Sequence, residues 1–256
     1  MSALTFIQPK WPVNKRVFCA STTIDGGVSS GVFNSLNLGT HVSDNALCVK
    51  KNRQLLADEL KIHVPNIQPI SWLNQTHSTN VLRLTEPTIA GAILADAAFT
   101  QTPDLPCNVM TADCMALMMA NSAGTEVAAV HAGWKGLING VIENTVAQFS
   151  SPRHDIHVWF APSISQQHFE VGFDVADLFS HFPSVLKASS ENNKLLLDLL
   201  AVASLKLDAL GISQRYYSNI CTYSATNLFS HRRTTHQGSS TCGRMTNLIL
   251  IKDLHN

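Results

Sequence analysis

Two histidines and one cysteine stand at the ends of three apolar, strand-like segments of this sequence. The segments ISWLNQTH, PCNVMTADC and TEVAAVH end at His77, Cys114 and His131. Imidazole nitrogen and thiolate sulfur bind zinc and copper, and three such ligands leave a fourth coordination position for water or substrate. The three residues are 37 and 17 positions apart, so only the tertiary fold can gather them at one end of a sheet. The pattern predicts an open, catalytic metal site.

A metal-free interpretation uses two of these residues. Cys114 would be a catalytic nucleophile and His131 its base, with a third polar group orienting the imidazole. This interpretation leaves His77 unexplained, whereas a zinc ion explains all three residues. The six cysteines form no CxxC pair, so an alternative is that Cys114, like the others, is a small buried residue of the core.

Copper is the second metal that two histidines and a cysteine suit. Blue copper sites add a long axial methionine, and Met115, Met118 and Met119 follow Cys114 closely. Such sites, however, take a cysteine and a histidine from one short loop. Adjacent strand residues also point to opposite faces, so Met115 should point away from Cys114. We therefore expect Zn²⁺ rather than Cu²⁺.

The segment after His131 has the composition of an anion site. HAGWKGLING predicts a strand, a glycine-containing turn and a helix start, whose free backbone N–H groups would face an anion. Lys135 adds a positive charge there. The alternative is that Gly133 and Gly136 only form a tight turn while Lys135 lies in solvent. The GxxxxGK[ST] pattern of a P-loop is absent.

Helices and strands alternate along the chain, which favours an α/β fold with mixed sheets. Apolar spacing predicts helices over 45–60, from 137 to about 149, and over 194–210, the last one ending at Gly211. Residues typical of strands occupy 67–73, 80–84, 92–100, 108–119, 126–131, 157–161 and 216–221.

Length and composition favour a single domain over residues 1–256. The 45% of hydrophobic residues can form a substantial core, and no linker divides the chain. Eighteen basic and eighteen acidic residues cancel, so no overall charge attracts nucleic acid or an anionic membrane. No signal-like start or long apolar run occurs, so we expect a cytoplasmic protein. No feature points to an obligate protein partner.

Several motifs together resemble one known family. NQTHS, TADC and VHAGWKG occur in this order, with GGVSSGVFNSLNLGTHVSDN before them and FEVG, SHRR and CGR after them. This set, from about Gly26 to the C-terminus, resembles the YfiH-type family, also called the laccase-domain, polyphenol oxidase or peptidoglycan editing factor family. The resemblance implies mixed β-sheets flanked by helices, in a layered α-β-β-α arrangement related to the catalytic domain of cytotoxic necrotizing factor. It also implies His77, Cys114 and His131 as zinc ligands.

The resemblance further implies activity on purine nucleosides. The reactions are phosphorolysis of adenosine, inosine or methylthioadenosine and hydrolytic deamination of adenosine, so a nucleoside and phosphate are the expected partners. Alternatives are an editing hydrolase for peptidoglycan precursors, a copper polyphenol oxidase and a non-catalytic module stabilised by zinc. This chain departs from the commoner family pattern at His231, where many members have tyrosine, and in CMALMM, where many have CVPVLL.

Each reaction assigns roles to further residues. Deamination needs a carboxylate that transfers protons to the leaving ammonia, and Asp113 is our candidate among Asp96, Asp113 and Glu170. An aspartate at a turn can instead be a cap or turn former.

Phosphorolysis needs groups that bind phosphate, and arginine does so through two parallel hydrogen bonds. We predict substrate binding by Lys135, Arg232 and Arg244, with Arg233 as a further candidate. Asn34 and Asn37 of the FNSLN segment would contact ribose hydroxyls. The alternative for these two is an asparagine-rich turn.

Overall fold

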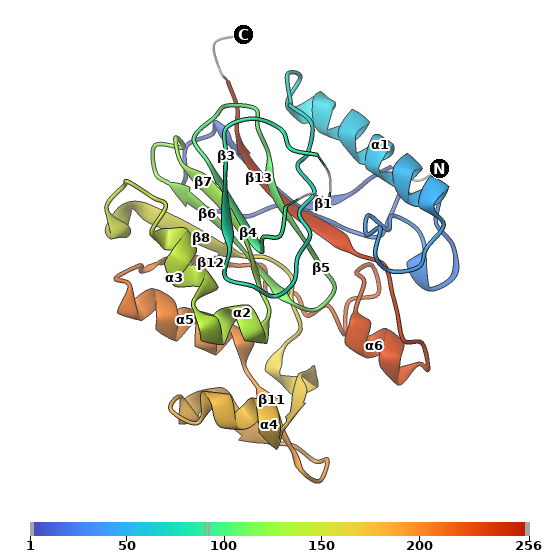
Figure 1. The fold of residues 1–256 in the computed structure, drawn as a ribbon, viewed down its shortest axis with the longest axis vertical. Helices are drawn as coiled ribbons and strands as arrows, with labels where there is room; N and C mark the ends of the chain where they lie inside the picture. Colours follow the sequence, from blue (N-terminus) through green and yellow to red (C-terminus); the bar gives the residue numbers. More distant parts are fainter. Residues whose placement is uncertain (1–2, 90, 92, 254–256) are drawn as a thin grey trace.

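Two β-sheets packed face to face form the centre of the molecule, and helices cover the outer face of each sheet (Figure 1). The computed structural model describes residues 3–89, 91 and 93–253. The larger sheet is mixed, with the spatial order β12 (Gln214–Tyr217), β8 (Ile156–Phe160), β6 (Met115–Asn121), β7 (Val127–Ala132), β4 (Ala97–Thr100) and β3 (Val81–Leu84). Only the two outer pairs, β12 with β8 and β3 with β4, are parallel.

The smaller sheet unites the two ends of the chain. Its antiparallel strands are β1 (Phe6–Ile7), β2 (Val17–Thr22), β13 (Met245–Ile251) and β5 (Cys107–Thr111). β13 lies between β2 and β5, so the residues just before it reach the same end of the molecule as the loop that follows β5. Arg244 directly precedes β13.

Helices and a small accessory sheet complete the structure. The helices are α1 (Ala46–His63), α2 (Trp134–Asn139), α3 (Val141–Val146), α4 (Phe173–Ala176), α5 (Leu199–Ala209) and α6 (His231–His236). The accessory sheet has the order β10 (Leu186–Ala188), β11 (Lys194–Leu197) and β9 (Glu170–Gly172). Short 3₁₀ turns are η1 (Gly31–Phe33), η2 (Arg153–Asp155), η3 (Gln166–His168), η4 (Asp177–Phe179) and η5 (Pro183–Val185).

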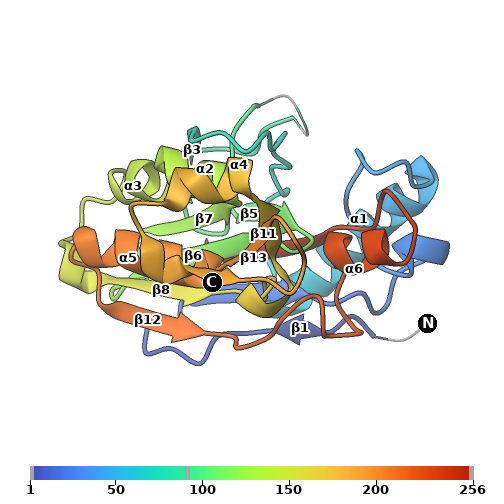
Figure 2. The same ribbon diagram turned by 90° about the horizontal axis from the view of Figure 1, so that it is seen from below.

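Side-chain alternation along the strands builds three apolar layers. On β6, Met115, Leu117 and Met119 pack with α2, α3 and α5, whereas Ala116, Met118 and Ala120 pack between the two sheets. On the other side, Leu56 and Leu60 of α1 pack against Phe18 and Leu250 of the smaller sheet. The layers therefore run helix, sheet, sheet, helix, as Figure 2 shows from below. The predicted layered α-β-β-α fold is confirmed.

The predicted helices are correct in place but not in their boundaries. The first one is α1, and its cap is Asn45, whose side chain accepts hydrogen bonds from the amides of Leu47 and Cys48. The second is two short helices, because Gly140 adopts a left-handed φ of 99° between α2 and α3. The third was predicted too long, because strand β11 occupies its first residues before Asp198 caps α5.

Two of the predicted strands are wrong in ways that matter for the site. Residues 67–73 form no strand, because the Gln68 amide bonds to the Asp104 carbonyl and the Trp72 carbonyl accepts from the Gly91 amide, in separate loops. Most of the apolar side chains of this segment pack under α1. Residues 108–119 are two strands in different sheets, β5 and β6, separated by a turn at 112–114. The predicted strand 92–100 is β4 from Ala97 onward, and its first residue, Ala92, lies outside the described residues.

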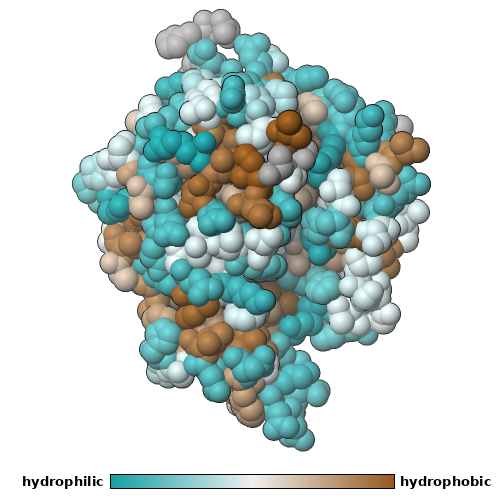
Figure 3. Space-filling view, viewed as in Figure 1, coloured by the Kyte–Doolittle hydropathy of each residue, from teal (hydrophilic) through white to brown (hydrophobic). Residues whose placement is uncertain are grey.

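The surface is largely hydrophilic, with apolar residues gathered in patches on the face shown in Figure 3. Among the large apolar side chains, Ile89 and Leu94 in the connection between β3 and β4 are 82% and 57% exposed. This connection meets the loop before His77 through a bridge between Asn74 and Leu94. Of the helices formed by residues 3–89, 91 and 93–253, none has the length and apolar character that crossing a membrane requires.

Asn52 of α1 should stabilise the FNSLN region. Its buried amide accepts from the Val28 amide at 2.8 Å and donates to the carbonyls of Ser35 and Asn37 at 3.1 and 2.9 Å. We expect Asn52→Ala to lower the free energy of unfolding by about 2 to 3 kcal/mol, because it leaves buried polar groups without partners. Urea unfolding measures the loss, and Lys51→Ala at an exposed position is the control. Equal stability of the two variants would contradict this role.

Candidate metal centre

His77, Cys114 and His131 converge at the end of the larger sheet, as predicted. Their ligand atoms all lie within 4.8 Å of one another, and Cys114 Sγ is 3.8 Å from His77 Nε2. Around a tetrahedral zinc ion, such atoms are separated by roughly 3.5 Å. Small side-chain rotations therefore suffice to close the three ligands on one ion. The three residues converge although they do not all end strands as predicted, since only His131, in β7, lies within a strand.

A single buried carboxylate, that of Asp96, orients two of the three ligands. Asp96 Oδ1 is 2.8 Å from His131 Nδ1, so this nitrogen donates and Nε2 is left to face Cys114. The same carboxylate accepts hydrogen bonds from the backbone amides of Thr76, His77 and Ser78 at 3.1, 3.0 and 2.6 Å. Asp96 is 0% exposed, so these bonds form away from water. A carboxylate behind a ligating histidine fixes its tautomer and ring orientation.

The loop that carries His77 is held in a conformation that few residues adopt. His77 itself has a φ of 60°, in the left-handed region. Two residues earlier, Gln75 pairs with the backbone of Met110 in β5, donating to its carbonyl at 2.9 Å and accepting from its amide at 2.7 Å. The side chains of Gln75 and Asp96 thus attach this loop to both sheets and keep His77 in place.

Cys114 lies where the chain passes from the smaller sheet to the larger one. It follows Asp113, which has a φ of 95°, and directly precedes β6. The sharp turn at Asp113 brings the thiol beside β7, because Met115 pairs with Ala132 and Ala116 with His131. Strand pairing therefore determines the distance between Cys114 and His131.

The electrostatics of the cluster favour the thiolate that metals bind. Burial opposes ionisation of Cys114, but the charge and hydrogen bonds of His131 and His77 outweigh it and lower the pKa of the thiol to about 6. Burial likewise lowers the pKa of His131, but Cys114 and Asp96 together raise it to about 9. The hydrogen bonds from His131 and Ser78 also outweigh burial at Asp96 and lower its pKa to about 2.

Gly133 allows the ligands to approach one another. A Cβ atom at this position would lie 2.8 Å from His77 Cδ2 and 3.1 Å from Cys114 Sγ. The φ of Gly133 is −67°, so space rather than backbone strain requires glycine here. We predicted Gly133 as part of an anion-binding turn, whereas its contacts place it against the ligands. The donor set, its carboxylate support and this close packing fit a zinc ion.

Two cavities meet at the cluster. The first, of about 160 Å³, includes Trp134, Phe169 and Arg232 beside Cys114, and we call it the aromatic cavity. The second, of about 330 Å³, includes His41 and Arg244 beside His131, and we call it the polar cavity. Both include His77, Ala112, Cys114 and His231. The cluster is therefore open on two sides of different chemistry.

The predicted arginines Arg232 and Arg244 lie in different cavities beside the cluster. Arg232 is in the aromatic cavity, where its guanidinium donates to the carbonyls of His168 and Glu170 at 3.1 and 2.9 Å. Arg244 is in the polar cavity. Arg233 is instead bonded to the carbonyls of the 222–228 loop and lies in neither cavity. Substrate binding by Arg232 and Arg244 stays a prediction, and it is compatible with their positions in the two cavities.

The predicted asparagines and Lys135 are not in these cavities. Asn37 is 0% exposed, and its amide is bonded to Gly39, Asp44 and the Arg244 amide. Direct ribose contact by Asn37 stays a prediction, and it would require one of these bonds to open. Asn34 is exposed at the end of η1, and Lys135 is exposed with its Nζ 5.4 Å from the Trp134 ring.

Asp113 lies in the aromatic cavity, but both its carboxylate oxygens have protein partners. Oδ1 accepts from Thr222 Oγ1 and Oδ2 from the Arg232 amide, each at 2.6 Å. These bonds attach the start of α6 to the turn before Cys114. A catalytic role for Asp113 stays a prediction, and it would require one of these bonds to open.

Sequence reasoning missed the function of Asp96 and the position of His41. Asp96 was considered as a proton carrier, whereas its contacts make it the support of His131 and of the His77 loop. The signal was available, since a carboxylate commonly accompanies a ligating histidine. His41 in GTHVSDN carried no such signal, because only the fold brings it to the polar cavity.

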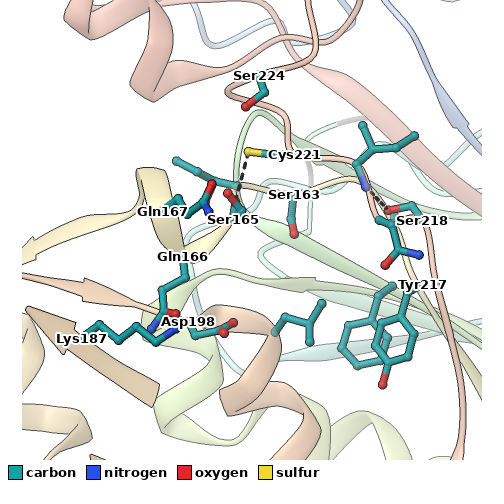
Figure 4. Close-up of a pocket in the computed structure, with 16 residues that line it drawn as sticks. Ser163, Ser165, Gln166, Gln167, Lys187, Asp198, Tyr217, Ser218, Cys221 and Ser224 are labelled. Atoms are coloured by element: carbon teal, nitrogen blue, oxygen red, sulfur yellow. Dashed lines mark hydrogen bonds between the residues drawn. The ribbon is translucent and has the colours of Figure 1, made fainter. Parts of the chain in front are cut away.

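A larger cavity, of about 520 Å³, lies apart from the cluster and shares only Ile164 with the aromatic cavity. Figure 4 shows Cys221 and Ser224 at one end of it and Tyr217, Lys187 and Asp198 at the other. The Ser165 amide donates to Cys221 Sγ at 3.3 Å. No residue that we predicted for metal or substrate lines this cavity.

The layered fold and the two-histidine, one-cysteine cluster define a candidate metalloenzyme whose metal site opens to two cavities. The chain belongs to the family described as multi-copper polyphenol oxidoreductase laccase, whose model matches residues 18–252. The family includes the YfiH proteins, so the expected family is confirmed.

Relatives with assigned names are purine nucleoside phosphorylases. The chain is 41% identical to "Purine nucleoside phosphorylase" of Haemophilus influenzae, over 95% of this chain and 98% of that one. It is 39% identical to "Purine nucleoside phosphorylase YfiH" of Escherichia coli K12, over 96% and 98%. These names support an enzyme.

Solved structures of the family have the same fold. NMB0706 of Neisseria meningitidis is 36% identical, with a TM-score of 0.86 over 97% of this chain and 99% of that one. YlmD of Geobacillus stearothermophilus is 26% identical, with a TM-score of 0.87 over 99% and 98%. The fold assignment therefore rests on both sequence and structure.

We expect Gly133→Ala to weaken zinc binding by about tenfold or more while changing stability little. The new methyl group would displace His77 or Cys114, and metal sites tolerate only small departures in ligand distance. Competition with a chromophoric chelator measures the affinity. Gly136→Ala is the matched control, because its Cβ meets a Val141 methyl at 3.3 Å and no ligand side chain. Equal zinc affinity of the two variants would rule out this constraint.

Zinc binding should release about one proton near pH 7. Between the lowered pKa of Cys114, about 6, and the raised pKa of His131, about 9, the two side chains together hold one proton. Both side chains must be unprotonated at the atom that binds zinc, so this proton has to leave. The apparent affinity should thus rise as pH increases toward 9 and fall more steeply below about 6, where the thiol is also protonated. Calorimetry in buffers of different ionisation enthalpy counts the proton. Binding without proton release would exclude this pair as ligands.

Proposed function

We propose that this protein is a zinc-dependent purine nucleoside phosphorylase that accepts adenosine, inosine or methylthioadenosine and also deaminates adenosine. The observation that carries the proposal is the cluster of His77, Cys114 and His131 between two cavities, in a chain 41% identical to a named phosphorylase. The aromatic cavity offers Trp134 and Phe169, on which a purine ring can stack. The polar cavity offers cationic groups for phosphate.

The protein's own residues have separate tasks in this reaction. Zinc at the cluster would supply a Lewis acid that polarises a substrate oxygen or lowers the pKa of a water molecule. Asp96 keeps His131 in one tautomer, and the loop bonds of Asp96 and Gln75 hold His77 in position. Trp134 and Phe169 would orient the base, and enclosure by the cavity walls would limit competing hydrolysis.

Phosphorolysis itself is a displacement at the ribose. An oxygen of HPO₄²⁻ forms a bond to C1′ while the bond between C1′ and the purine nitrogen breaks. The purine leaves with the bonding electron pair and takes the proton that the phosphate carried. Positioning of the phosphate and the sugar within bonding distance is the main contribution that a protein makes to such a step.

A single zinc ion fits this chain better than the several coppers in the family's description. Among the described residues, His77, Cys114 and His131 are the one group of histidine, cysteine or acidic side chains close enough to hold an ion. Met115, Met118 and Met119, the possible axial ligands of copper, are all fully buried in the apolar layers. A colourless protein that consumes no oxygen with phenols would agree with zinc.

The test is product analysis with the zinc-loaded protein, adenosine or inosine, and phosphate. We expect free purine and ribose 1-phosphate, formed only when phosphate is present, and slow conversion of adenosine to inosine. His77→Ala should lower kcat/KM about a hundredfold or more, because it removes a ligand of the metal. His154→Ala, at an exposed histidine of η2, is the control. Purine release without phosphate, or full activity of His77→Ala, would overturn the proposal.

A further inference from the structure

A third cavity, of about 460 Å³, adjoins the polar cavity, and we call it the adjoining cavity. The two share His41, Gln75 and Met110. The adjoining cavity also includes Arg53 of α1 and Trp72, whereas Arg244 and the metal cluster lie in the polar cavity. His41 therefore stands at the junction, with one arginine on each side.

Arg244 is held against the loop that carries His41. The Leu38 amide donates to the Arg244 carbonyl at 3.1 Å, and the Arg244 amide donates to Asn37 Oδ1 at 2.9 Å. A Cβ atom on Gly39 would lie 2.8 Å from Arg244 Cγ, so the loop passes directly over this side chain. The guanidinium donates from Nη1 to the carbonyls of Cys242 and Gly243. Within the described chain, Nε and Nη2 have no protein acceptor.

Arg53 is fixed to the same loop from the other side. Its Nε donates to the Leu38 carbonyl at 2.9 Å, and its guanidinium carbon lies 3.9 Å from the centre of the Trp72 ring. Stacking and this bond set the plane of the guanidinium. Both Nη atoms lack a protein acceptor in the part of the chain that the structure describes. Burial lowers the pKa of Arg53 to about 10, so the group remains charged at neutral pH.

No carboxylate of the described residues neutralises the positive charges of Arg53 and Arg244. Neither Arg53 nor Arg244 forms an ion pair with a carboxylate among the described residues. The pKa of His41 is lowered by partial burial and then by the charges of Arg244 and Arg53. Holding two like charges around one cavity junction costs free energy that a bound anion would offset.

We propose that His41, Arg53 and Arg244 form the binding site of the phosphate ion that attacks the nucleoside. The proposal rests on the phosphorolysis proposed above. Free N–H donors of the two arginines match the oxygens of a tetrahedral oxyanion, and His41 adds a further polar contact. Arg244 shares the polar cavity with Cys114 and His131, so phosphate bound there lies beside the cluster, where the sugar must be placed. Arg232, in the aromatic cavity, is left for the nucleoside.

Arg53→Gln and Arg244→Gln test this site in the zinc-loaded protein. We expect each to raise KM for phosphate about tenfold or more and to change KM for the nucleoside less than about threefold, because charged hydrogen bonds to phosphate are lost. Arg83→Gln is the matched control, since Arg83 also stacks on an aromatic ring, Phe99, and donates to a backbone carbonyl, but lines none of these cavities. Should a glutamine variant unfold, His41→Ala at an exposed position serves in its place, with the same expected change in phosphate KM.

Direct binding of inorganic phosphate, measured by calorimetry without nucleoside, separates this site from the activity. Arginine-dependent binding in a protein that turns over no nucleoside would retain the site and reject the proposed function. Phosphorolysis with an unchanged phosphate KM in both variants would reject the site and retain the function.

The site formed by His41, Arg53 and Arg244 could instead bind the 5′-phosphate of a nucleotide. In that case the glutamine variants would lose binding of adenosine monophosphate while keeping their phosphate KM, and the proposal would be wrong. Unchanged affinity for adenosine monophosphate beside a raised phosphate KM is the result that we expect.

Discussion

The carboxylate of Asp96 is the constraint on which the metal centre depends. It is fully buried, and it receives hydrogen bonds both from the ring of His131 and from three consecutive backbone amides of the His77 loop. A buried negative charge is tolerated only when such donors surround it. The ligand geometry and the stability of this region are therefore coupled, because any movement of His77 or His131 removes a donor from Asp96. Without that carboxylate, a loop and a strand would have no common point of attachment.

The sequence predicts the ligands better than it predicts the structure around them. His77, Cys114 and His131 were recognisable because metal chemistry restricts their residue types and the surrounding motifs are specific. The segment before His77 looked like a strand from its apolar residues, but most of these residues pack under α1 while the backbone follows a loop. Periodicity reports which side chains are buried, and it does not report which backbone groups pair. The same limit concealed the change of sheet at 112–114.

Residues expected to contact substrate show a second limit. Asn37 is a hydrogen-bonding residue near a functional loop, yet its amide is used entirely to join that loop to Arg244 and Asp44. Arg232 and Arg244 are both in the cavities, but the guanidinium of Arg232 is bonded to the distant His168 and Glu170, whereas that of Arg244 is bonded to the adjacent Cys242 and Gly243. A polar side chain in a turn has the same appearance in sequence whether it binds a ligand or supports its neighbours. Only the count of its satisfied hydrogen-bonding groups distinguishes the two.

Cys114 lies at the direct step from β5 of the smaller sheet to β6 of the larger one, while His131 belongs wholly to the larger sheet and Gln75 attaches the His77 loop to the smaller one. The metal ligands are consequently positioned by both sheets together. The distances between the ligands depend on how closely the two sheets pack. Small alanines and Met118 between the sheets set that spacing. Volume changes between the two sheets, well away from any ligand, would therefore alter the affinity of the site for its metal.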